Sequence, residues 1–128
     1  MVKLLMGRKE VDIHGLHFFA KSSRAPFHRK KVFENEHVVA FHDIQPAAPV
    51  HILIIPKKHI SSMNDVESED WYLLGEIHSA AQQIAREQGV AETGYRLINN
   101  CGPDSGQVVF HIHYHLLGGE KLGALNAR

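Results

Sequence analysis

The chain has 128 residues, a length typical of one compact domain. With 44% hydrophobic and 22% charged residues, its composition is that of an ordinary globular protein and excludes the disordered and membrane-embedded classes. Fourteen lysines and arginines balance fourteen aspartates and glutamates, so the formal net charge is zero. This balance does not favour a broad electrostatic surface for nucleic acid or an anionic membrane, whereas a small polar ligand is compatible with it.

Cys101 is the only cysteine in the sequence. A single cysteine rules out an internal disulfide and a CxxC metal knuckle, and it fits a reducing compartment. The apolar patch in the first fifteen residues is too short for a signal peptide or a membrane span. We therefore expect a cytoplasmic protein.

The first predicted elements are strands. Two β-rich runs, 32–33 and 38–41, flank the polar residues 34–36 and predict a β-hairpin. A third strand is expected over 50–55, where an apolar, β-branched run ends at Pro56.

A long helix is predicted over residues 68–88. Acidic residues begin this range, Gly89 follows its end, and apolar residues recur at helical spacing: Trp71, Leu74, Ile77, Ala81 and Ile84. After it, GYRLINN predicts a strand, CGPDSGQ a turn, and residues 108–119 a last strand. This order predicts an α+β fold, in which one long helix packs on a mainly antiparallel sheet.

The last predicted strand, VVFHIHYHLLGG, places three histidines at alternate positions. Since side chains alternate between the two faces of a strand, His111, His113 and His115 are expected on one face. The opposite face is expected to be core, made of Phe110, Ile112, Tyr114 and Leu116. Three imidazoles in register are costly to protonate together, which favours a functional site over an ordinary solvated cluster.

Two kinds of chemistry fit these histidines. In one, an HxH pair and either His51 or His42 bind a zinc ion. Against this reading, the stripe of three histidines has no neighbouring carboxylate to orient the ligands, and it spans roughly 13 Å of strand. In the other, one imidazole is a nucleophile at phosphorus, and the others position it or move a proton.

Two further stretches suit a phosphorylated nucleoside. NNCGPDSGQ combines glycines that permit close backbone approach, Gly102 and Gly106, with the neutral donors Asn100 and Gln107. Asp43 follows VVAFH, where it caps a turn or accepts hydrogen bonds from a ribose diol. In the second case, Phe41 and Ile44 supply apolar contact for a base.

The motif HIHYHLL resembles the signature of the histidine-triad (HIT) family of nucleotide hydrolases and transferases. VVAFHDIQPAAPVHILIIPKKHIS is similar to the Hint branch of that family, the phosphoramidase group, and the likeness runs from about residue 31 to 119. We therefore expect a divergent N-terminal segment over 1–24 and a single HIT domain over 25–128. Residues 1–24 lack the zinc-binding cysteine pair of some relatives, so no structural zinc is expected.

This resemblance implies a hydrolase of the adenosine 5′-monophosphoramidase type that needs no cofactor or metal for its chemistry. His113 would attack the α-phosphorus of an AMP- or GMP-linked amine, and water would release the nucleotide from a nucleotidyl-histidine. His115 would contact the phosphate, and His51 and His111 would belong to the surrounding histidine network. The implied nucleotide-binding set comprises Phe41, His42, Asp43, Ile44, Asn100, Gly106, Gln107, Val108, His113 and His115.

The resemblance also implies a homodimer, with the helix over 68–88 at the contact between subunits. Many relatives have serine or threonine where this chain has Val108, so we expect its backbone N–H to bind the nucleotide and poor amine leaving groups to be released slowly. Two other functions stay open. One is a nucleotide-binding interaction module with incidental turnover, and the other is a dinucleoside polyphosphate hydrolase of the Fhit branch.

Overall fold

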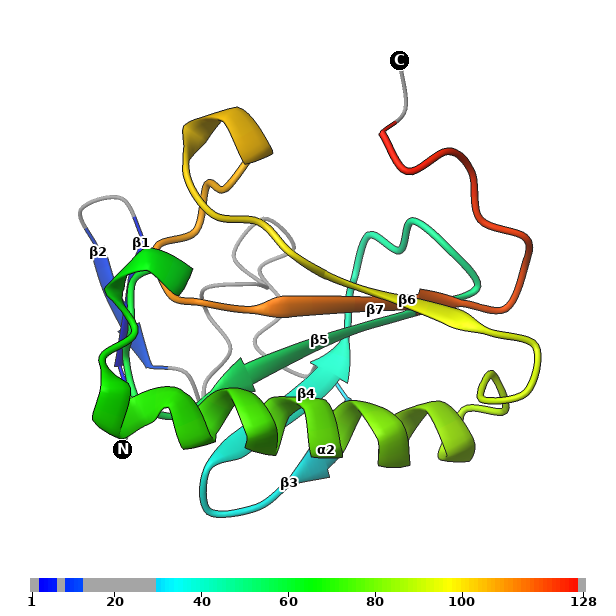
Figure 1. Cartoon of the computed structure of the whole chain (residues 1–128), viewed down its shortest axis with the longest axis horizontal. Coiled ribbons are helices and arrows are strands. Elements are labelled where there is room, and N and C mark those ends of the chain that lie inside the picture. The colour runs from blue at the N-terminus through cyan, green and yellow to red at the C-terminus, as the bar shows by residue number, and fades with distance from the viewer. Residues whose placement is uncertain (1–2, 7–8, 13–29, 127–128) are drawn as a thin grey trace.

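The computed structural model describes residues 3–6, 9–12 and 30–126. Five strands form one antiparallel sheet, and their order across it is β3 (Lys31–Glu34), β4 (Val38–His42), β5 (Val50–Pro56), β7 (Tyr114–Gly118) and β6 (Tyr95–Asn99). In the described ranges one long helix, α2 (Trp71–Glu87), lies along one face of this sheet (Figure 1). The predicted α+β class is confirmed.

A second, two-stranded sheet lies in the N-terminal segment. Its strands β1 (Lys3–Met6) and β2 (Lys9–Asp12) pair antiparallel, and the sequence analysis predicted neither of them. The other residues of segment 1–24 lie outside the described residues, so the division into segment and domain stays a prediction. Among the helices that the structure describes, none combines the length and apolar character needed to cross a membrane.

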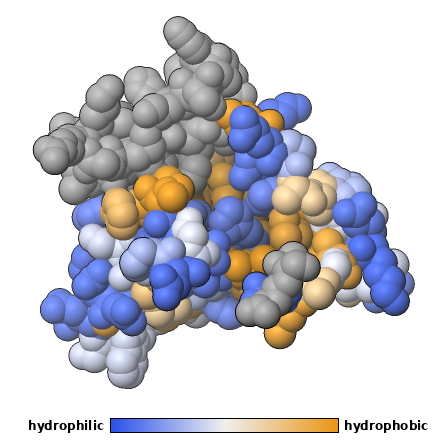
Figure 2. Space-filling model, turned by 90° about the horizontal axis from the view of Figure 1, so that it is seen from above, coloured by the Kyte–Doolittle hydropathy of each residue, from blue (hydrophilic) through white to orange (hydrophobic). Residues whose placement is uncertain are grey.

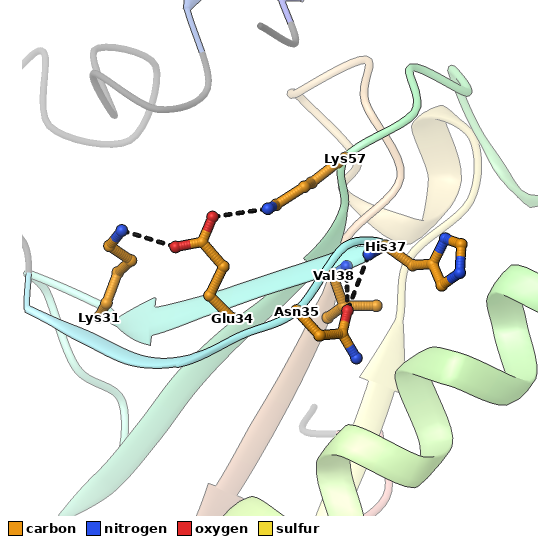
Figure 3. A network of polar contacts seen from close by, with 6 residues as sticks. All are labelled: Lys31, Glu34, Asn35, His37, Val38 and Lys57. Carbon is orange, nitrogen blue, oxygen red and sulfur yellow. Dashed lines mark hydrogen bonds and ion pairs between the residues drawn. The ribbon is translucent and has the colours of Figure 1, made fainter.

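The predicted hairpin is present as β3 and β4. Its turn is held by Asn35, whose side-chain Oδ1 accepts hydrogen bonds from two backbone N–H groups at 2.8 and 2.9 Å. Next to this turn, the Glu34 carboxylate contacts the ammonium groups of Lys31 at 2.7 Å and Lys57 at 2.6 Å (Figure 3). The hydrogen bonds from Lys31 and Lys57 lower the pKa of Glu34 to about 2. Lys57 thereby ties the end of β5 to the hairpin.

The two faces of the sheet have different roles. On β5, Ile52 and Ile54 point toward α2 and belong to the core that also contains Ile77 of the helix. Since strand side chains alternate, His51 and Leu53 lie on the other face. The loops 43–49 and 100–107 lie on this second side of the sheet, away from α2 (Figure 1). Figure 2 shows the molecule from this side, where hydrophilic and hydrophobic residues are neighbours on the surface.

The predicted helix over 68–88 is present in two parts. A 3-10 helix, η3 (Ser68–Asp70), leads directly into α2. At the other end, the N–H of Gly89 donates to the Arg86 carbonyl (3.2 Å), and the N–H of Val90 donates to the Ala85 carbonyl (2.9 Å). This pair of bonds is a Schellman motif, which needs the left-handed φ of 77° at Gly89.

The buried face of α2 differs from the predicted apolar stripe at its first residue. Ile77, Ala81 and Ile84 are buried as predicted, but Trp71 is 62% exposed. The buried face begins at Leu73. Because two residues correspond to about 200° of rotation about a helix axis, Trp71 lies on nearly the opposite side.

The histidine segment is not the continuous strand that we predicted. Strand β7 begins at Tyr114, so His115 lies within it, whereas His111 and His113 precede it. Residues 108–113 form hydrogen bonds outside the sheet ladder, which are described below, and these bonds compete with strand pairing. Phe110 is 45% exposed, which corrects its place on the core face; the other predicted members of that face are buried: Ile112, Tyr114 and Leu116.

Two glycine substitutions on the same helix should have opposite effects. Gly89→Ala should lower the free energy of unfolding by about 1–2 kcal/mol, because alanine is strained at positive φ. Gly75→Ala, inside α2, should raise it by about 0.5–1 kcal/mol, because alanine is the better helix former. A Cβ at either position meets nothing within 4 Å, so crowding does not enter. Urea denaturation compares the variants, and equal stability of both would contradict the role given to Gly89.

Candidate active site

The turn at residues 56–61 holds the histidine segment in place. Three of its backbone carbonyls accept hydrogen bonds: Pro56 from the His111 imidazole (2.8 Å), Ile60 from the Ile112 N–H (2.7 Å) and Ser61 from the Gln107 side chain (3.0 Å). The turn itself is fixed on both sides. The N–H of Lys57 donates to the His37 carbonyl at 2.8 Å, and the Lys58 ammonium lies 2.7 Å from the Asp70 carboxylate.

The completely buried imidazole of His111 has a hydrogen-bond partner at each ring nitrogen. Nε2 lies 2.8 Å from the Pro56 carbonyl oxygen, and because a carbonyl only accepts, Nε2 carries the hydrogen. In the neutral ring Nδ1 is then an acceptor, so its partner at 3.1 Å, Nδ1 of His59, is the donor. Burial lowers the pKa of His111 to about 3, which keeps this ring neutral.

His113 is held by its own segment and by strand β6. Its Nδ1 lies 2.8 Å from the backbone carbonyl of His111, so Nδ1 carries the hydrogen and Nε2 carries a lone pair. The carbonyl of His113 accepts a hydrogen bond from the Asn99 side chain at 2.9 Å. Burial lowers the pKa of His113, and the hydrogen bond to His111 opposes this change. A fixed, neutral imidazole with a lone pair on Nε2 is suited to nucleophilic attack.

His51 and His115 form a second hydrogen-bonded pair on neighbouring strands. Nε2 of His51 lies 2.9 Å from Nδ1 of His115. Nδ1 of His51 accepts a hydrogen bond from the Ala47 N–H at 2.9 Å, so neutral His51 carries its hydrogen on Nε2 and donates it to His115. His115 then carries its own hydrogen on Nε2. Its ring centroid lies 5.3 Å from that of His113, so a donor lies beside the candidate nucleophile.

Asp43 brings a carboxylate to this pair. Its Oδ2 lies 3.5 Å from Nε2 of His51, which corrects our expectation that no carboxylate neighbours the histidines. Its Oδ1 accepts a hydrogen bond from the Gln45 N–H at 2.8 Å, so the turn-capping role is present. Oδ2 takes no part in this turn cap and faces His51. The predicted contact of Asp43 with a ribose diol stays a prediction.

Asp43, His51 and His115 place three potential metal-ligand atoms within 4.8 Å of one another. The hydrogen bonds do not fit a metal ligand, however. A metal-bound histidine ordinarily donates its other N–H to an acceptor, whereas the other nitrogen of His51 accepts from Ala47. Metal at Nε2 would require that bond to break or the ring to lose a further proton. We therefore keep the prediction that the site uses no metal.

The loop over 102–107 is shaped by two glycines and by Gln107. Gly102 and Gly106 have φ values of 87° and 93°, in the region that favours glycine. The Gln107 side chain is buried; its Oε1 accepts from the Gly102 N–H at 2.9 Å, and its Nε2 donates to the carbonyls of Ser61 and Val109 at 3.0 Å. The side chain that we expected to donate to phosphate thus shapes the loop instead. Phosphate contact by this loop stays a prediction.

Three predicted nucleotide-binding residues lie at different depths. Phe41 is completely buried in β4, in register with Leu53, which is in register with His115. The structure therefore brings Phe41 into the same row of the sheet as a site histidine. Ile44 is 39% exposed and Val108 is 75% exposed, so both are accessible to a ligand.

His42 differs from the other predicted residues. It pairs with Ile52, a member of the core on the α2 side, so strand alternation places its side chain away from His51. Asn100 follows β6 directly and is half-buried. The sequence analysis missed His59 and Asn99 as supporting residues. No local pattern marks them, although His59 stands in the same KKHIS stretch that carried the resemblance.

The burial of the histidine site keeps its imidazoles neutral. Burial is the largest cause of a lowered pKa in each of the four predicted histidines: His51, His111, His113 and His115. The pKa of His115 falls to about 4, since the neighbouring rings of His113 and His51 also disfavour its charge. The Asp43 carboxylate acts in the opposite direction on His51, His113 and His115.

Comparison with known proteins identifies the family. Residues 24–122 match the HIT domain, so the chain belongs to the HIT family. It is 47% identical over 109 residues to the purine nucleoside phosphoramidase of Escherichia coli K12, a match that covers 85% of this chain and 92% of that protein. An uncharacterized HIT-like protein of Chlamydia muridarum is 50% identical over 95 residues, which cover 74% of this chain and 75% of that one.

Solved structures agree with this assignment. A histidine triad protein from Clostridium difficile superposes with a TM-score of 0.76 at 44% identity, covering 84% of this chain and 94% of that one. A HIT family hydrolase from Legionella pneumophila gives a TM-score of 0.74 at 44% identity with the same coverage. The family resemblance expected from the histidine motif is thus confirmed.

Folding stability should decrease as the pH falls from about 6.5 toward about 3. An unfolded histidine takes up a proton near pH 6.5, whereas His115 and His111 have pKa values of about 4 and about 3 in the folded protein. In this window the unfolded state binds more protons, so the free energy of unfolding falls with the pH. Urea unfolding at a series of pH values measures the slope. A free energy of unfolding that stays constant or rises on acidification would contradict the buried neutral histidines.

Proposed function

We propose that this protein hydrolyses the P–N bond of purine nucleoside phosphoramidates and releases AMP or GMP. The single observation that carries the proposal is the 2.8 Å bond from His113 Nδ1 to the His111 carbonyl, because it leaves the lone pair on Nε2. The relationship to the E. coli purine nucleoside phosphoramidase supports this substrate class.

In the proposed first step, Nε2 of His113 attacks the α-phosphorus while the P–N bond breaks. The amine leaves with a proton, and the nucleotide stays bound as nucleotidyl-histidine. Water then attacks the same phosphorus, the bond to Nε2 breaks, and the nucleoside monophosphate is released. The Nε2–H of His115 would contact a phosphate oxygen. Because Val108 has no side-chain donor, the amine takes its proton from His115 or from water.

The nucleoside would bind beside the histidines. Asp43 would accept hydrogen bonds from the ribose hydroxyls through its Oδ2, since its Oδ1 already holds the Gln45 N–H. The buried Phe41 and the partly exposed Ile44 would supply apolar contact to the base. The phosphate would meet Asn100, Gly106 and the backbone of Val108, in a loop whose shape the Gln107 side chain maintains.

Two other functions are distinguished by one comparison. A nucleotide-binding interaction module would bind AMP but release it from a phosphoramidate only marginally. A dinucleoside polyphosphate hydrolase would release AMP faster from a dinucleoside polyphosphate than from an adenosine phosphoramidate. We expect the phosphoramidate to be the better substrate, and AMP release from both compounds under identical conditions decides between the three.

We also propose that the protein is a cytoplasmic homodimer. The single cysteine, Cys101, fits a reducing compartment. β6 is an edge strand whose Tyr95 is 37% exposed, and a groove lined in part by Tyr95, His78 and Gln82 runs between β6 and α2. An edge strand beside a groove suits a two-fold contact. Light scattering after size-exclusion chromatography would refute the dimer if it gave the mass of one chain.

His113→Ala should abolish AMP release while AMP still binds, because only the bond to phosphorus is lost. We expect a decrease in kcat of at least about a thousandfold. His37→Ala, which removes a half-buried histidine of the hairpin turn outside the site, is the matched control and should leave turnover unchanged. EDTA should have no effect on the parent. If EDTA stopped turnover and His113→Ala did not, the metal hypothesis would replace this one.

Asp43→Asn should separate the ribose contact from the turn cap. Asparagine keeps an Oδ1 acceptor for the Gln45 N–H, so the melting temperature should stay close to that of the parent. The lost charge should weaken AMP binding by about 1.5–3 kcal/mol, roughly 10- to 150-fold. Calorimetric titration with AMP measures the affinity. If Asp43→Asn bound AMP as tightly as the parent, Asp43 would be a turn cap without a ribose contact.

A further inference from the structure

One histidine in contact with the site is not used by the proposed reaction. His59 lies in the turn 56–61, and its residue is exposed, in contrast to the completely buried His111. The two ring centroids are 5.1 Å apart with the planes inclined at 52°, and the two Nδ1 atoms lie 3.1 Å apart. A surface side chain therefore reaches the innermost ring of the site.

The direction of this hydrogen bond follows from the other side of the His111 ring. Since Nε2 of His111 donates to the Pro56 carbonyl, Nδ1 of the neutral ring needs a donor, and His59 supplies it through Nδ1–H. Both nitrogens of a buried imidazole are thereby satisfied, which prevents it from turning toward another partner.

His111 also controls the candidate nucleophile through its backbone. Its carbonyl accepts the Nδ1–H of His113 at 2.8 Å, and the next peptide is anchored by the Ile112 N–H bond to Ile60 at 2.7 Å. The ring and the carbonyl belong to one residue in a segment without strand pairing, so a fixed ring fixes the carbonyl.

We propose that His59 is a positioning residue: its Nδ1–H holds the His111 ring, and the His111 carbonyl in turn keeps the hydrogen of His113 on Nδ1 and the lone pair on Nε2. The inference rests on the proposed role of His113 as nucleophile. It adds a residue outside the histidine triad, at the surface of the molecule, to the groups on which turnover depends.

Two substitutions whose side chains have the same branching and the same number of heavy atoms test the donor itself. His59→Leu removes the N–H, whereas the side-chain amide of His59→Asn places an N–H near the position of Nδ1–H. His59→Leu should lower kcat for an adenosine phosphoramidate about 10- to 100-fold, with KM changed less than about threefold, because a displaced reacting group affects the chemical step. His59→Asn should recover most of kcat. His37→Ala controls for the loss of a histidine outside the site.

Nitrogen-15 NMR shows which ring nitrogen of His113 carries the hydrogen. This tautomer would not change if His59 only stabilised the fold. The parent and His59→Asn should report hydrogen on Nδ1, and His59→Leu should report a mixture of the two tautomers. If both His59 variants matched the parent in kcat and tautomer while His113→Ala was inactive, this inference alone would fail. Equal losses in the leucine and asparagine variants would also overturn it. An active His113→Ala protein would instead overturn the proposed function.

Discussion

The hydrogen bond between the buried His111 ring and the Pro56 carbonyl is the constraint on which the rest of the site depends. It assigns the hydrogen of a ring that burial keeps neutral, and it does so from a turn that two lysine ion pairs fix to the body of the fold. The proton positions of His111 and His59 follow from it, since one ring nitrogen that donates makes the other an acceptor. The cost of burying a polar ring without partners is what makes the assignment firm.

A second series of hydrogen bonds, in which each donor is also assigned, ends beside the candidate nucleophile His113. It starts from a backbone N–H, that of Ala47, and runs through His51 to His115. As a result, Nε2 of His113 is a hydrogen-bond acceptor, whereas Nε2 of the neighbouring His115 is a donor. The end of the histidine segment and the start of β7 thus offer a lone pair and a hydrogen side by side, although the two side chains are of the same type.

Local signals in the sequence were sufficient for most of the fold. The polar turn of the hairpin, the apolar run of β5 and the helix end at Gly89 each depend on neighbours a few residues away, and each was predicted correctly. The start of β7 was not, because residues 108–113 bond to a turn about fifty residues earlier. The approach of Asp43 to His51 and the contact of His59 with His111 are likewise set by the folded sheet. The misplaced Trp71 shows that a periodic pattern does not fix which of its end residues is buried.

The neutrality of the four imidazoles of the site also determines how an anionic ligand would be recognised. The two lysines of the turn at residues 56–61 are paired, Lys57 with Glu34 and Lys58 with Asp70, and the chain as a whole has no formal net charge. Neither these lysines nor the net charge of the chain would therefore attract a phosphate over a long distance. Its selection would take place at contact, through oriented N–H dipoles, and dissolved salt, which screens charges at a distance, would affect it little.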